Sequence, residues 1–102
     1  MKIGITPSSG NVFRDIGFSP EEAARLTVRS DLMIRIDRLI DSRKLTQAKA
    51  AALFGVTQPR VSDLVRGKIH LFSIDTLVDM LAHAGVRVRV VTGPAPKRRR
   101  VA

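Results

Sequence analysis

Apolar residues recur at helical spacing over most of this chain, and capping residues divide the pattern into segments. The first segment begins at Ser19, which can cap a helix; Pro20 fits the first helical position, and Glu22 closes a capping box. No helix-breaking residue appears before about Lys44, so the sequence predicts one long helix. Its buried stripe is expected to consist of Val28, Leu32, Ile36, Leu39 and Ile40.

Two short helices are expected next, joined by a tight turn. Thr46 can cap a helix over about residues 47–54, and Gly55 suits the left-handed residue that ends it. Thr57 can cap the following helix, in which Pro59 is tolerated because first-turn amides have no partner within the helix. That helix has one apolar side, which predicts a buried face, and one polar side, which is what insertion into the major groove of DNA requires. The apolar side consists of Val61, Leu64 and Val65, and the polar side of Gln58, Arg60, Ser62 and Asp63.

A fourth helix and a strand complete the pattern. Ser73 can cap a helix that is apolar on one face through Ala82, and Gly85 ends it. Residues 86–91 then alternate with period two, which predicts a β-strand. Because no second strand is evident in the chain, we expect two copies to pair antiparallel in a dimer; the alternative is an extended strap on the same domain. The residues expected to carry the pairing strand and to cover the fourth helix are Val86, Val88 and Val90, while Arg87 and Arg89 stay in water.

Length and composition are typical of one small globular domain. The chain has 102 residues, of which 44% are hydrophobic and only 4% aromatic, so the core must be aliphatic. The absence of cysteine excludes disulfides, thiolate metal sites and cysteine nucleophiles. No apolar run approaches the roughly 20 residues of a membrane span, and the first ten residues do not resemble a secretory signal. We therefore expect a cytoplasmic protein that does not enter membranes.

The chain is expected to divide into an N-terminal arm (1–18), a folded domain (19–91) and a basic disordered tail (92–102). The arm has a small apolar patch, in which Val12, Phe13 and Phe18 either pack on the long helix or dock a partner protein. In the tail, Gly93, Pro94 and Pro96 precede the basic run at residues 97–100.

Positive charge gathers on particular segments. The net charge is +9, yet residues 1–42 hold six basic and six acidic side chains. Residues 43–70 hold six basic side chains and one acidic one, and residues 71–102 hold six basic and two acidic ones. Basic charge on one element indicates a polyanionic partner, most simply nucleic acid, although a solubilising surface is the alternative.

The segment at 45–67 resembles the helix-turn-helix of the Xre family, the Cro- and repressor-like bacterial regulators. The matching residues are Leu-Thr-Gln-Ala at 45–48, Gly-Val-Thr at 55–57, Val-Ser at 61–62 and Arg-Gly at 66–67. The wider pattern, from Asn11-Val12-Phe13 through Phe18 and on through the long helix to residues 58–64, looks like the subgroup of HigA-type antitoxins and related small regulators. The family usually has a larger apolar residue where this chain has Ala50.

The resemblance implies that the third helix lies in the major groove with its first residues at base edges. Gln58 can then pair with adenine and Arg60 with guanine, while Ser62 can reach a base or a phosphate. Pro59 shapes the helix start or contacts a thymine methyl group. Gln47 is similar to a family residue that grips phosphate and braces the reading helix. The candidate phosphate contacts, which position the helix rather than read sequence, are Arg43, Lys44, Gln47, Thr57, Arg66 and Lys68.

Other interpretations of these residues stay open. Gln58 is also consistent with a solvated first-turn residue, Arg60 with an ion pair to Asp63, and Ser62 with a neutral surface position. His70 and His83 have no acidic cluster nearby, so we expect no metal and no cofactor. The sequence has no phosphate-binding glycine loop and no nucleophile motif, and we expect no enzymatic activity.

The predicted fold is all-α: a repressor-like helix-turn-helix domain of about four helices with a single C-terminal strand. The predicted function is sequence-specific binding of double-stranded DNA by a transcriptional regulator that represses its own operon. An alternative is an antitoxin that also binds and neutralises a toxin ribonuclease, as the HigA resemblance implies. A further alternative is nonspecific RNA binding through the basic run at 97–100.

Overall fold

The computed structural model describes residue 13 and residues 16–94, and these contain four α-helices and one short 3-10 helix. The predicted four-helix framework is confirmed. The part of the arm before Phe13, with Val12, and the basic run at 97–100 lie outside the described residues. The elements in chain order are α2 (Pro20–Ser42), α3 (Gln47–Phe54), α4 (Gln58–Val65), η1 (Ile69–Leu71) and α5 (Ile74–His83).

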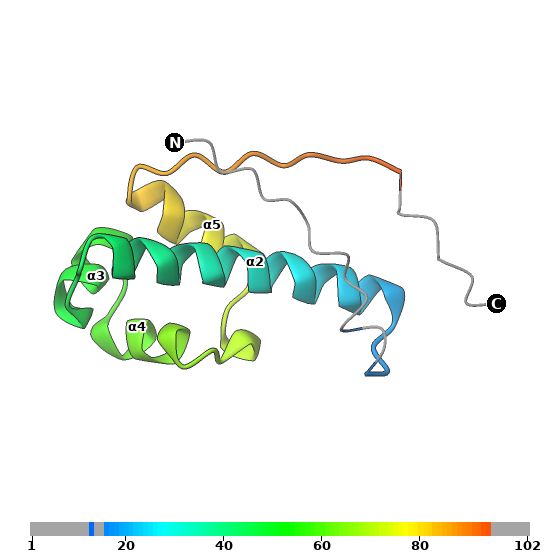
Figure 1. Ribbon diagram of the computed structural model, residues 1–102, viewed down its shortest axis with the longest axis horizontal. Coiled ribbons are helices and arrows are strands. Elements are labelled where there is room, and N and C mark those ends of the chain that lie inside the picture. The colour runs from blue at the N-terminus through cyan, green and yellow to red at the C-terminus, as the bar shows by residue number, and fades with distance from the viewer. Residues whose placement is uncertain (1–12, 14–15, 95–102) are drawn as a thin grey trace.

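The long helix α2 runs through the middle of the fold (Figure 1). It packs against α5 on one side and against α4 and η1 on the other, while α3 contacts both α4 and α5. The core between them is aliphatic apart from two buried phenylalanines, Phe54 and Phe72. Small residues let α3 approach its neighbours closely, since Ala50 is fully buried and Ala51 nearly so. As a result, α4 lies at the surface, on the other side of α2 from α5.

Three of the four helices begin with the side-chain cap that the sequence predicted. Ser19 accepts from the Glu22 amide at 3.2 Å, Thr46 from Lys49 at 3.1 Å and Ser73 from Thr76 at 3.1 Å. The start of α4 differs: Thr57 occupies the cap position, but its side chain makes no capping hydrogen bond.

The exception at Thr57 follows from the residues after it. Pro59, at the second helical position, has no amide hydrogen to offer a cap. The next amide, that of Arg60, instead bonds the Thr57 carbonyl at 3.1 Å. The Thr57 hydroxyl therefore stays available at the open end of α4.

The ends of α2, α3, α4 and α5 share one hydrogen-bond pattern. After each, an amide bonds the carbonyl five residues earlier: Leu45 to Ile40, Val56 to Ala51, Lys68 to Asp63 and Val86 to Leu81, at 2.9–3.1 Å. After α3 the left-handed residue of this turn is Gly55 (φ +68°). The left-handed residue that this turn needs is Gly67 after α4 (φ +74°) and Gly85 after α5 (φ +78°). After α2 it is Lys44 (φ +51°), a residue with a Cβ in a backbone conformation that favours glycine.

Three residues predicted on apolar faces are exposed: Val28, Val65 and, near the end of α5, Ala82. Val28 is 38% exposed, because the buried side of the first turns of α2 runs through Ala23 and Thr27 and leaves Val28 at its edge. Val65 is 40% exposed at the last residue of α4, where the chain turns toward η1. The remaining stripe residues of α2 are buried, and they are joined by Ala23, Thr27 and Met33, which the periodicity did not single out.

The predicted C-terminal strand is not found among the described residues. Residues 86–94 are extended but carry no strand or bridge. The reason is that a strand is defined by a hydrogen-bonded partner, and within the described part of this single chain none lies beside it. Val86 and Val88 are half-buried against the core, as predicted, and Arg87 and Arg89 are exposed. Val90 was expected to cover α5 as well, but it is 84% exposed. Only the first part of the alternating segment therefore packs on the core.

Candidate nucleic-acid interface

The first turn of α4 is open to solvent, as are the first turns of α2 and α3. Thr57, Gln58 and Pro59 are all exposed, and Ser62, one turn later, is half-buried. The opposite side of the same helix is anchored by Val61 and Leu64, which are 1% and 3% exposed. The buried pair fixes the rotation of α4, so Thr57, Gln58 and Pro59 face outward together. Amides at a helix start and its positive dipole end favour anionic groups.

Arg60 lies differently from the other predicted base readers. It is half-buried, and its Nη1 donates a hydrogen bond of 3.0 Å to the carbonyl oxygen of Leu71. Its guanidinium carbon lies 4.3 Å from the ring centroid of Phe72, a residue that is only 1% exposed. The pairing with Asp63 that the sequence offered as an alternative is not what the structure records, because Asp63 pairs with Lys68.

Basic side chains lie around this surface, and they differ in whether they form an ion pair within the fold. Lys68 Nζ lies 3.5 Å from Asp63 Oδ1. Arg43, Lys44, Lys49 and Arg66 are exposed, and in the described part of the chain no ion pair joins them to a carboxylate. Gln47 is exposed at the first position of α3. Apart from Lys68, these residues can therefore meet an anionic partner without first breaking an ion pair within the described part of the chain.

A histidine that sequence reasoning left without a role supports the turn between α3 and α4. His83 Nδ1 lies 2.9 Å from the carbonyl oxygen of Leu53, near the end of α3. Its ring also covers Gly55, since a Cβ built on Gly55 would lie 2.8 Å from the ring. The contact joins residues thirty positions apart, and no local pattern in the sequence could have revealed it.

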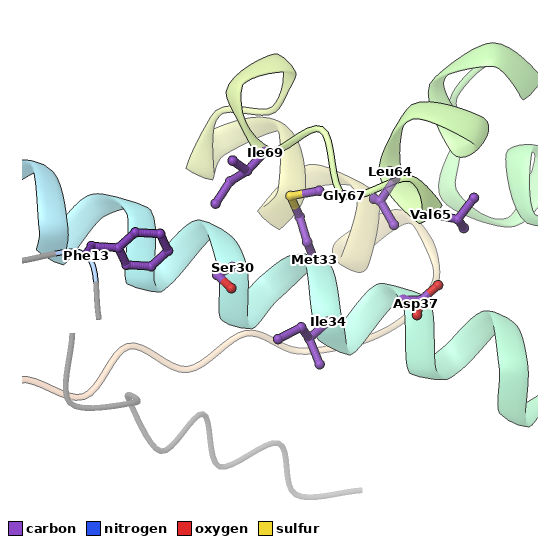
Figure 2. A pocket seen from close by; sticks show the side chains of 9 residues that line it. All are labelled: Phe13, Ser30, Met33, Ile34, Asp37, Leu64, Val65, Gly67 and Ile69. Carbon is purple, nitrogen blue, oxygen red and sulfur yellow. The ribbon is translucent and has the colours of Figure 1, made fainter. Parts of the chain in front are cut away.

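An apolar groove lies between α2 and the end of α4 (Figure 2). Its volume is about 330 Å³, and Phe13 closes one end of it. Within the arm, Phe13 meets Phe18 edge to face, with ring centroids 6.2 Å apart. Because Phe13 also lines the groove with Ser30 and Met33 of α2, it packs on the domain. The groove presents exposed apolar side chains at Ile34 (47%) and Val65 (40%). Its other walls include Met33, Asp37, Leu64 and Ile69.

Two further observations concern ions and membranes. Among residues 13 and 16–94, no three His, Asp or Glu side chains gather as a metal ion would require. Nor does any helix in that part of the chain combine the length and the apolar character needed to cross a bilayer.

Comparison with known proteins places the chain among helix-turn-helix proteins. The sequence model of a family described as a helix-turn-helix domain matches residues 12–93. A solved structure, described provisionally as an XRE family transcriptional regulator, superposes with a TM-score of 0.67 at 32% sequence identity. That match covers 79% of this chain and 91% of the other. None of the curated proteins matches the chain.

Proposed function

The chain belongs to the helix-turn-helix family whose model spans residues 12–93, and on that premise we propose that it is a sequence-specific DNA-binding transcriptional regulator. The similar solved structure, described as an XRE family regulator, supports the same function. One observation carries the proposal: the open start of α4 presents Thr57, Gln58 and Pro59 outward, beside basic side chains that have no partner within the described fold.

In the proposed complex α4 lies in the major groove. Gln58 and Ser62 read base edges, and Pro59 contacts a thymine methyl group. The hydroxyl of Thr57 and the side chain of Gln47 bind phosphates, together with Arg43, Lys44 and Arg66. Lys68 contributes its charge from within the ion pair with Asp63. Arg60 is not among the base readers we propose, for the reasons given in the next subsection.

The test is selection of a binding site from a random duplex library, followed by affinity measurements on the selected duplex and all its single base-pair variants. We expect Gln58→Ala to cost about 1–3 kcal/mol and to remove the preference at one base pair. Arg66→Gln is the matched control, and it should weaken every duplex alike and lower the salt dependence by about one phosphate contact. A Gln58→Ala profile identical to that of the native chain would rule out base reading by this residue.

We further propose that the regulator represses its own operon as a homodimer. Within the described residues the segment 86–91 forms no strand or bridge, and its backbone groups beyond the Val86 amide are ones that two copies could share. A two-fold dimer would place two copies of α4 about one DNA turn apart, roughly 34 Å, as a palindromic operator requires. Repression predicts that the selected sequence occurs upstream of the gene itself, and its absence there would separate DNA binding from self-regulation.

The apolar groove between α2 and α4 supports a second proposed function, the binding of a protein partner such as a toxin ribonuclease. Ile34 and Val65 expose apolar surface on opposite walls, a feature typical of protein contacts. Co-expression with the product of the adjacent gene tests the idea. We expect Ile34→Glu to abolish co-purification and leave DNA binding intact. Co-purification that survives this change would exclude the groove as the docking surface.

A further inference from the structure

Arg60 combines two contacts that hold its side chain against the fold. The hydrogen bond to the Leu71 carbonyl uses one of its terminal nitrogens, and the Phe72 ring covers the guanidinium at 4.3 Å. Phe72 is buried in the core, so the surface beneath the guanidinium is fixed. A cation over an aromatic face is favourable, and more so when it is partly desolvated.

These contacts conflict with reading a guanine. Arginine reads guanine by pointing two parallel N–H donors at O6 and N7. In this structure Nη1 already donates to Leu71, and the guanidinium lies over the ring of Phe72. Arg60 would have to give up both contacts to reach a base edge, whereas the neighbouring Gln58 is exposed and makes no recorded side-chain contact within the described residues.

The contacts of Arg60 connect the first turn of α4 to the end of η1. The segment between them, residues 66–72, carries Arg66, Lys68 and His70. The same segment is held near its beginning by the ion pair between Asp63 and Lys68. Arg60 and Asp63, both on α4, thus hold the two ends of the basic loop. These contacts set the distance between the backbone of the loop and Gln58.

We propose that Arg60 is a positioning residue, which sets the basic loop at 66–72 in register with the reading residues of α4 and does not read sequence itself. This inference rests on the proposed DNA-binding function. It assigns the sequence preference to Gln58, Pro59 and Ser62, and it makes Phe72 a functional partner of Arg60 although Phe72 has no access to DNA.

The experiment compares Arg60→Met, Arg60→Lys and Phe72→Leu with the native chain on the selected duplex and its single base-pair variants. Arg60→Met and Phe72→Leu are expected to weaken binding to all duplexes by a similar factor, roughly three- to thirty-fold, the range for losing one such contact. The order of preference among duplexes should not change. The double variant should bind no worse than the weaker single one, because both changes break the same link.

Arg60→Lys makes the test independent of whether Phe72→Leu folds. Lysine can also donate to guanine O6 and N7, so a base reader would keep its preference for one base pair. Lysine is a point charge that cannot cover the Phe72 ring with a flat group and donate to Leu71 at the same time, so a positioning residue would lose part of its affinity for all duplexes alike, with no change in preference. Loss of preference at one base pair in Arg60→Met, with retention in Arg60→Lys, would overturn the proposal.

A last measurement distinguishes failure of this inference from failure of the proposed function. If the native chain selects no DNA sequence, the regulator function fails, but the link remains testable by thermal unfolding of the same variants. Non-additive shifts in Tm for the Arg60→Met and Phe72→Leu pair would support the link. Strictly additive shifts would overturn it.

Discussion

The pair α3–α4 and the C-terminal segment 86–94 are both short, apolar-patterned pieces of chain, yet they are held in different ways. The pair is enclosed by buried side chains, by the Thr46 cap, by glycines at both helix ends and by His83 from a distant helix. The segment has only Val86 and Val88 against the core, and its exposure rises to 84% at Val90. An apolar periodicity therefore does not by itself determine secondary structure, because the apolar side chains also need other parts of the fold to pack against.

The largest effect is expected where the pair is most tightly enclosed. Gly55→Ala puts a Cβ 2.8 Å from the His83 ring in a left-handed residue, and it should lower the free energy of unfolding by about 2–4 kcal/mol. Gly67→Ala is the control, since Gly67 is also left-handed but nothing lies within 4 Å of its added Cβ. It should cost about 1 kcal/mol, measured by denaturant unfolding. Equal losses at the two glycines would show that the His83 contact does not matter.

An intermediate effect of opposite sign is expected at the turn before α3. Lys44 holds a left-handed conformation where Gly67 and Gly85 end the helices α4 and α5. Lys44→Gly should therefore raise the free energy of unfolding by up to about 1 kcal/mol. If Lys44 contacts phosphate as proposed, the same change should also weaken DNA binding and lower its salt dependence by about one contact.

Lys44→Ala separates these two effects. Alanine removes the charge and keeps the strained backbone, so binding should fall without any gain in stability. A Lys44→Gly protein that is more stable and binds DNA as tightly as the native chain would remove Lys44 from the interface.

The smallest effect on the fold is expected in the C-terminal segment. Val90 and Val91 are more than 80% exposed, so replacing either with proline should change the free energy of unfolding by less than about 0.5 kcal/mol. Neighbouring amides in a strand point to opposite edges, so in a strand-paired dimer only one of the two prolines removes a ladder donor. Sedimentation should show one variant dissociating more than the other. Equal behaviour, or a monomeric native chain at micromolar concentration, would exclude pairing through this segment.

The helices and their limits followed from the sequence because caps, glycines and apolar spacing act locally. Ser19, Thr46 and Ser73 cap as predicted, since each needs only an amide three residues away. Thr57 was expected to do the same, but Pro59 has no amide hydrogen, and the next amide, that of Arg60, bonds the Thr57 carbonyl instead of its hydroxyl. Exposure at the edges of the core was harder to predict, as Val28 and Val65 show, because it depends on how each helix is rotated against its neighbours and on where the chain turns away.

The location of the candidate site on the chain could be predicted from the sequence, but the side-chain contacts within it could not. The sequence located the exposed start of α4 at Gln58 and Pro59, because buried Val61 and Leu64 fix the opposite face. It could not show that Arg60 turns toward Phe72, twelve residues away, or that Lys68 is the partner of Asp63. Choices among long, flexible side chains depend on tertiary neighbours, and these do not appear in any local pattern.

The contact between His83 and the end of α3 also bears on protein engineering. A helix-turn-helix is often treated as a cassette that can be moved between scaffolds, but here the turn at Gly55 is completed by a residue of α5. A graft of residues 45–67 alone would leave the Leu53 carbonyl without its partner and the glycine uncovered. New binding specificity is better installed by exchanging positions 58, 59 and 62 in place, where the side chains are exposed or half-buried and the scaffold, with His83, stays intact.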